Sequence, residues 1–221
     1  MLLIFNPLSI KALSVLLRSC STQSRIYNTL RALHSLLLIP DNIEDPVQIF
    51  HKSFPDFLMD PIRCTDAQFF VEPKIHHKEI TLSCLNVMKG GLKENICNLD
   101  DHTSLSEVEN LHASRRVYIG DALEYACCFW TTHLSRTAGS SLCVGEVQKE
   151  IDEFFSTCFL SWIEVLSLLG KLDVGVYALS DIEQWYMKVS CMWRVYSRNL
   201  CSCSFRLESP ASGQTTANTF S

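Results

Sequence analysis

The residues of this chain that could bind phosphate or activate a nucleophile do not form a complete catalytic motif. Gly170 and Lys171 match the Gly-Lys pair of a phosphate-binding loop, but Leu172 stands where that loop has Ser or Thr, and Val165 replaces its first glycine. The sequence also contains neither the H-E-x-x-H motif of zinc proteases nor the G-x-S-x-G motif of serine hydrolases. We therefore expect no enzyme activity, no catalytic residue and no cofactor. A Cys–His pair assembled by folding stays open as an alternative.

Two adjacent histidines, His76 and His77, are candidate metal ligands, with Cys64 or Cys84 as further donors. Neighbouring residues of a helix point about 100° apart, so the two imidazoles cannot easily share one ion. We predict no metal site, with one histidine facing the core and the other facing solvent.

The 11 cysteines do not suggest a disulfide framework. Cys127 and Cys128 are adjacent, and several others fall on apolar helix faces, where a free thiol packs as a small hydrophobic side chain. Cys201 and Cys203 could bind a metal, but no second pair lies at the spacing of a zinc site. This pattern favours a reducing compartment, and we predict a cytoplasmic protein.

The composition predicts a folded, acidic protein. Of 221 residues, 47% are hydrophobic and 19% are charged, which supports a sizeable core, and the net charge is −5. Residues 1–40 carry four basic side chains and no acidic one, so the acidic excess lies in the rest of the chain. An acidic body repels phosphate backbones, and we expect no nucleic-acid partner.

No stretch of the sequence is long and apolar enough to predict a membrane span. The nearest candidate, Phe154–Leu169, has 16 residues and contains Glu164, whereas a span needs roughly 18 or more uncharged apolar residues. The N-terminus is apolar and basic and has some character of a transit peptide, but it also fits folded structure. We therefore expect no membrane contact.

The first 60 residues have the outline of a winged-helix module, which we place at residues 7–60. A helix capped by Ser9 and a second helix over Arg25–Leu33 precede two short strands, His34–Pro40 and Val47–His51, joined by a turn. A short helix then starts at Ser53, which has the spacing of a capping box with Asp56.

Residues 70–196 show helical periodicity and predict an antiparallel helical bundle, so the chain as a whole is expected to be mainly α. The apolar positions predict one helix through residues 80–88 that resumes at 92 and 96, a second over Tyr118–Leu134, a loop from 137 to 145, and a third over Glu146–Leu169 ended by Gly170. A fourth helix is predicted to open at Ser180, with Glu183 completing a capping box.

Residues 197–221 have no clear pattern, and we predict a disordered tail there. Within the third helix, Phe154, Phe155, Trp162 and Leu166 form an apolar stripe that fits a bundle core, with a partner surface as the alternative.

Several motifs taken together resemble the region after the NTPase core in the expanded NACHT proteins of mushroom-forming fungi, which are NLR-like members of the STAND NTPase class. The resemblance extends from about Pro7 to Ser190. Its motifs are Leu33–Leu37, Phe50–Leu58, Asp60–Asp66, Asn95–Asp100, Ala122–Cys127 with Trp130 and His133, and Asp173–Leu179 with Trp185 and Tyr186.

The resemblance implies a regulatory arm in a nucleotide-gated signalling switch of non-self recognition and cell death. In this class ADP holds the NACHT core closed against the winged helix, and a winged-helix histidine before an aromatic-rich short helix senses the β-phosphate. His51, between Phe50 and Phe54, matches that position. An imidazole that donates to a phosphate oxygen is sensible chemistry, and a structural hydrogen bond at the end of a strand is the alternative.

The family has its P-loop, Mg²⁺ aspartate and arginine sensors upstream of the region matched here, so we expect this chain to be a truncated gene product, a fragment or a stand-alone remnant. As a regulatory module it would bind another NACHT-type chain or a second copy of itself, through an apolar surface around His51. A self-contained helical interaction scaffold would instead have a closed polar surface there. A third hypothesis is a mitochondrially targeted protein that uses the basic N-terminus.

Overall fold

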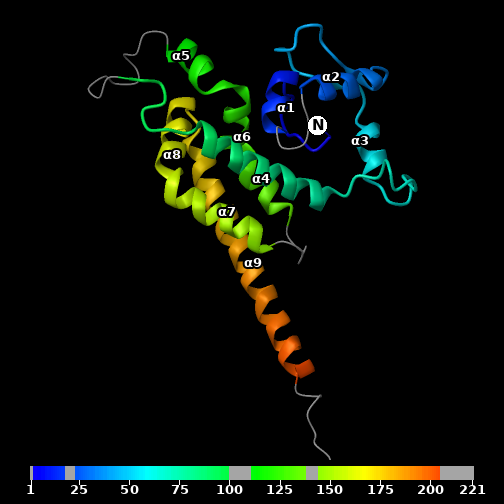
Figure 1. Ribbon diagram of the computed structural model, residues 1–221, viewed down its shortest axis with the longest axis vertical. Helices are drawn as coiled ribbons and strands as arrows, with labels where there is room; N and C mark the ends of the chain where they lie inside the picture. Colours follow the sequence, from blue (N-terminus) through cyan, green and yellow to red (C-terminus); the bar gives the residue numbers. More distant parts are fainter. Residues whose placement is uncertain (1, 18–22, 100–110, 138–143, 205–221) are drawn as a thin grey trace, which may run out of the picture.

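The computed structural model describes residues 2–17, 23–99, 111–137 and 144–204, of which residues 111–113 and 190–204 are described by their backbone alone. This part of the chain is mainly helical, with one two-stranded antiparallel sheet (Figure 1). The mainly α fold predicted from the sequence is therefore confirmed. Its elements are α1 (Ile10–Leu16), α2 (Gln23–Ala32), β1 (Leu37–Leu38), β2 (Gln48–Ile49), α3 (Ser53–Leu58), α4 (Pro73–Gly91), α5 (Leu111–Tyr118), α6 (Gly120–Ser135), α7 (Val144–Thr157), α8 (Phe159–Leu169) and α9 (Leu172–Ser204).

The predicted order of two helices followed by a hairpin is present in the N-terminal region. Ser9 caps α1, because its Oγ accepts a hydrogen bond from the backbone N–H of Ala12 at 3.1 Å. Strands β1 and β2 pair Leu37 with Ile49. The predicted first strand is too long, because residues 33–36 form a turn that follows α2. In this turn the Leu36 N–H donates to the Leu33 carbonyl at 2.8 Å.

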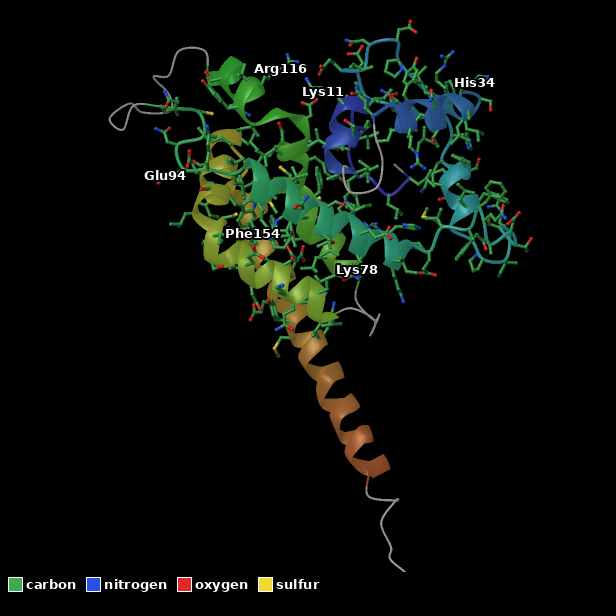
Figure 2. The ribbon with its side chains drawn as sticks, in the orientation of Figure 1. Lys11, His34, Lys78, Glu94, Arg116 and Phe154 are labelled. Carbon is green, nitrogen blue, oxygen red and sulfur yellow. The ribbon has the colours of Figure 1, made fainter. Side chains whose placement is uncertain are left out.

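The helical bundle is centred on α4 and α6, with α7, α8 and α9 packed around them (Figure 1). Helix α1 also packs on α4 and α6, so one hydrophobic core runs through the N-terminal module and the bundle. Phe154 lies inside the bundle (Figure 2). The stripe predicted to form the core does so, because Phe154, Trp162 and Leu166 are fully buried and Phe155 is half-buried.

Two predicted helices of the bundle are wrong in extent. The helix predicted over Tyr118–Leu134 begins two residues later as α6, because Gly120 adopts a φ of +63° and separates it from α5. The long helix predicted over Glu146–Leu169 is divided into α7 and α8 at Cys158, whose φ of −120° departs from helical geometry. Gly170 ends α8 as predicted, in the left-handed conformation with a φ of +69°.

The last helix starts earlier and ends later than predicted. Helix α9 begins at Leu172, directly after the turn at Gly170, so the predicted capping box at Ser180 and Glu183 lies in its interior. It continues to Ser204, through the first residues of the predicted tail, and extends well beyond the bundle (Figure 1). The remainder of the predicted tail, residues 205–221, and most of the predicted loop, residues 138–143, lie outside the described residues.

The segment after α4 is not helical, although its apolar spacing predicted that the helix resumes. Helix α4 ends at Gly91, and Asn95 has a φ of +48°. The carboxylate of Glu164 on α8 accepts hydrogen bonds from the backbone N–H groups of Asn95 and Ile96, each at 3.0 Å. These bonds hold the turn in place and allow Ile96 to be buried without a helix.

Candidate functional site

His51 lies just after β2, in the turn that leads into α3, and its side chain is exposed. Its Nδ1 accepts a hydrogen bond from the backbone N–H of Ser53 at 3.1 Å and lies 2.8 Å from the Ser53 hydroxyl. The ring therefore performs the capping that the sequence assigned to Ser53 and Asp56, and the predicted capping box does not form. Because Nδ1 is an acceptor, the neutral ring carries its proton on Nε2, which makes no hydrogen bond within the described part of the chain.

Large apolar side chains are exposed on the segments beside His51. They come from the turn before β1, from β1, from the turn after β2, from α3, and from the segment between α3 and α4. Backbone hydrogen bonds join these segments, from Phe50 to Leu36 at 3.1 Å and from Val71 to Leu58 at 2.9 Å. We call this set the module surface, and its members are Leu36, Leu38, Phe50, Phe57, Ile62 and Phe69.

The Gly-Lys pair that resembles part of a phosphate-binding loop has a structural role. Gly170 caps α8, and the backbone N–H of Lys171 bonds to the Leu166 carbonyl at 2.8 Å. The Lys171 ammonium forms an ion pair with the Glu124 carboxylate at 2.7 Å. The Lys171 ammonium thus contacts a side chain of α6, and the backbone of residues 170 and 171 ends α8.

His76 and His77 point to different environments, as predicted. His76 lies at the surface, where its Nδ1 is 2.8 Å from a carboxylate oxygen of Glu79. His77 is only 3% exposed, and its Nδ1 lies 2.7 Å from Nδ1 of His133. Across the described residues there is no group of three or more His, Cys, Asp or Glu side chains that could hold a metal ion. Cys84 is fully buried, and burial raises the pKa of its thiol.

A buried polar chain continues from His133 to the N-terminal segment. Nε2 of His133 lies 2.7 Å from the Tyr125 hydroxyl, whose oxygen accepts a hydrogen bond from the Phe5 N–H at 3.3 Å. The Phe5 ring packs against both imidazoles, with centroid distances of 6.2 Å to His77 and 4.6 Å to His133. Helices α4 and α6 and the residues before α1 thus meet at one hydrogen-bonded cluster.

Burial keeps the groups of this cluster neutral. It lowers the pKa of His77 to about 4, helped by the charges of Arg136 and His76. It lowers the pKa of His133 to about 3, with further contributions from His77 and Arg136. Burial likewise raises the pKa of the Tyr125 hydroxyl. All three side chains are uncharged at neutral pH.

Sequence reasoning did not find this cluster. His133 lies on the same helical face as the buried Ala126 and Trp130, which was a signal that its imidazole is buried. Its partner His77 is 56 residues away in the sequence, and no local pattern pairs the two.

The cysteines whose side chains the structure describes are free and buried: Cys64, Cys84, Cys97, Cys127, Cys128 and Cys158. Among them no thiol forms a hydrogen bond with a histidine; Cys128, for example, lies 3.7 Å from the Lys171 ammonium instead. Burial is the main cause that raises the pKa values of the Cys127 and Cys128 thiols. Such thiols are weak nucleophiles at neutral pH.

A depression of about 60 Å³ lies where α5 meets α6. Arg115 and Arg116 line it together with Asp121 and Glu124. Because two carboxylates offset the two guanidinium groups and the volume is small, this depression does not suit a nucleotide. Arg116 lies toward the outside of the molecule (Figure 2).

Comparisons of the chain with protein-family models, with curated proteins and with solved structures give no match. Over the part of the chain that the structure describes, none of the helices has the length and apolar character needed to cross a membrane.

Proposed function

We propose that this chain is a non-catalytic regulatory arm of a NACHT-type signalling NTPase, and that its module surface docks on a nucleotide-binding NACHT core. The observation that carries the proposal is the exposure of apolar side chains beside His51, where Phe50 is 61% exposed and Ile62 is 86% exposed. Clustered apolar side chains on a protein surface are typical of an interaction site. A scaffold unrelated to NACHT proteins was expected to have a polar surface at this position.

In this proposal His51 is the group that senses the nucleotide. Its Nδ1 is held by Ser53, which fixes the ring and leaves the Nε2 proton to donate to a phosphate oxygen of the docked core. The structural hydrogen bond and the sensing role are therefore compatible, because they use different nitrogen atoms. The free, buried cysteines support the cytoplasm as the compartment of this arm.

The test is the affinity of the chain for a recombinant NACHT core of this class, loaded with ADP and measured by calorimetry. Phe50→Asp replaces a member of the module surface that is 61% exposed with a charged side chain, and we expect it to weaken binding at least roughly tenfold. Leu160→Asp is the matched control, because Leu160 is also a strongly exposed apolar residue, with 79% of its surface exposed. It belongs to α8, a helix on the side of the bundle away from α3 (Figure 1). Equal affinities for the two variants, or no binding by the wild-type chain, would refute the proposal.

A second candidate function is a helical scaffold for another kind of protein partner. It is favoured by a separate group of exposed apolar side chains on α8 and α9, namely Leu160, Val176 and Tyr177. The same pair of variants distinguishes the two functions when binding partners are compared. A partner that is lost with Leu160→Asp and kept with Phe50→Asp supports the scaffold.

A further inference from the structure

The polar cluster of His77, His133 and Tyr125 has one arrangement of protons in which every donor in its hydrogen bonds has an acceptor. The Tyr125 oxygen already accepts from the Phe5 N–H, so its own proton is free to be donated to Nε2 of His133. His133 then carries its proton on Nδ1 and donates it to Nδ1 of His77. The opposite direction would leave the buried Tyr125 proton without an acceptor in the cluster, which is costly.

In this arrangement each of the three nitrogen atoms in the cluster's hydrogen bonds is already used. Nε2 of His133 accepts, Nδ1 of His133 donates and Nδ1 of His77 accepts. A proton added to either accepting nitrogen would have to displace the one already donated there. The displaced proton has no other acceptor in the cluster, so protonation leaves at least one buried donor unpaired.

The groups around the two imidazoles do not compensate a new positive charge. Those facing the pair are the Tyr125 hydroxyl and the Arg136 guanidinium on the α6 side and the His76 imidazole on α4, with the Cys84 thiol near Tyr125. Within the described residues neither His77 nor His133 forms a hydrogen bond with a carboxylate. An imidazolium here would be buried and unpaired, which proteins avoid.

We propose that the His77–His133–Tyr125 cluster is an acid-sensitive latch that fastens the N-terminal segment, residues 2–9, across α4 and α6. Phe5 is the part of the segment that the latch holds, through its N–H on Tyr125 and its ring against both imidazoles. Arg136 also packs on Phe5, with its guanidinium 4.6 Å from the centre of the Phe5 ring. When a proton enters the cluster, a buried donor is left unpaired, the hydrogen bonds at Tyr125 are weakened and the Arg136 guanidinium faces a new positive charge. The segment then leaves α4 and α6. Helices α7 and α8 stay folded, because none of their described residues forms a hydrogen bond or ring contact with His77, His133 or Tyr125.

The latch does not depend on the proposed NACHT partner, since it concerns contacts within this chain. Its test is amide hydrogen exchange of the whole chain at about pH 7 and about pH 4.5, corrected for intrinsic exchange, together with NMR titration of the histidine imidazoles. We expect protection of residues 2–9 to fall at least roughly tenfold at the lower pH, while α7 and α8 keep theirs. His77 and His133 should take up protons in the same pH range in which the segment opens.

Two variants make the test specific. Tyr125→Phe removes both the donor to His133 and the acceptor of the Phe5 N–H, so we expect weaker protection of the segment at about pH 7 and an opening that moves to a higher pH. His34→Gln changes an exposed histidine that forms no hydrogen bond with the cluster, and should leave the opening where it is in the wild-type chain. Two results would overturn the latch: protonation of both histidines with no change in protection of residues 2–9, or loss of protection in α7 and α8 together with that segment. The wild-type experiment decides between these results even if a variant does not fold.

Discussion

The bundle and the module surface differ in where they hold their aromatic side chains. In the bundle, Trp130, Phe154 and Trp162 pack against one another, with 5.1 Å between the ring centres of Trp130 and Phe154, and all three are fully buried. On the module surface, Phe50 and Phe57 face outward. The buried aromatic side chains of the bundle stabilise the fold. The exposed ones on the module surface contribute little to stability and are available for binding. The comparison predicts that mutations in the bundle core change the free energy of unfolding, whereas mutations on the module surface change the affinity for a partner.

The largest stability effect should come from the bundle core. Trp162→Ala removes a fully buried side chain and its hydrogen bond to the Cys127 carbonyl at 3.0 Å, and we expect a loss of about 3–5 kcal/mol in the free energy of unfolding. Phe50→Ala should change the same quantity by less than about 0.5 kcal/mol. Denaturant unfolding of both variants checks the contrast. A large loss in Phe50→Ala would mean that the module surface is structural.

Acid should destabilise the chain through its buried histidines. The folded-state pKa values of His77 and His133 lie below the ordinary value of 6.5, at about 4 and about 3, so the unfolded chain binds protons first as the pH falls. Their contribution is fully present above pH 6.5 and is lost progressively below it, until the folded-state pKa values are passed. Each histidine should contribute up to about 1.4 kcal/mol per pH unit in this window.

This pH dependence is measured by denaturant unfolding at a series of pH values between about 7 and 4.5. Replacing both histidines with Gln should reduce the slope, whereas His34→Gln should preserve it, because His34 is exposed and forms no hydrogen bond with the cluster. A slope that persists unchanged in the double variant would assign the acid sensitivity to other groups.

The turn after α4 should depend on one carboxylate. Glu164→Ala leaves the N–H groups of Asn95 and Ile96 without their acceptor, and we expect a loss of about 1–3 kcal/mol. Glu164→Gln keeps one acceptor oxygen and should lose less. Hydrogen exchange of these two amides locates the effect. An equal loss in both variants would show that the negative charge rather than the hydrogen bonds matters.

The smallest predicted effects compare two glycines that both have room for a methyl group. Gly170→Ala forces a residue with a side chain into a φ of +69°, and we expect a loss of about 1 kcal/mol. Gly90→Ala lies in the last turn of α4 with no atom near the new methyl group, and should stabilise the chain by up to about 1 kcal/mol. Thermal unfolding measures both. The same sign for the two changes would contradict the role of Gly170 as a helix cap.

Local patterns predicted the features of the fold that depend on neighbouring residues. The capping of α1 by Ser9, the end of α8 at Gly170 and the opposite environments of His76 and His77 each follow from contacts or directions within one turn of helix. The early start of α9 was missed because Ser180 and Glu183 have the same spacing in a helix interior as at a cap.

Features that depend on distant residues could not be predicted in this way. Periodicity predicts a resumed helix at Ile96, but the Glu164 carboxylate on another helix stabilises a turn there instead. The cap of α3 is a histidine side chain from the preceding turn, which no standard capping motif includes. The pairing of His77 with His133 joins two helices, so the candidate latch became visible only in the folded chain.

The measurement that tests the central claim most directly is the ratio of affinities of this chain for a NACHT core loaded with ADP and for the same core loaded with a non-hydrolysable ATP analogue. A regulatory arm whose His51 contacts the β-phosphate of the closed state should bind the ADP form at least roughly tenfold more tightly. His51→Ala should bring the ratio close to one and, because it removes the cap of α3, should lower the free energy of unfolding by no more than about 1–2 kcal/mol. Equal affinities of the wild-type chain for the two forms would contradict the proposed function.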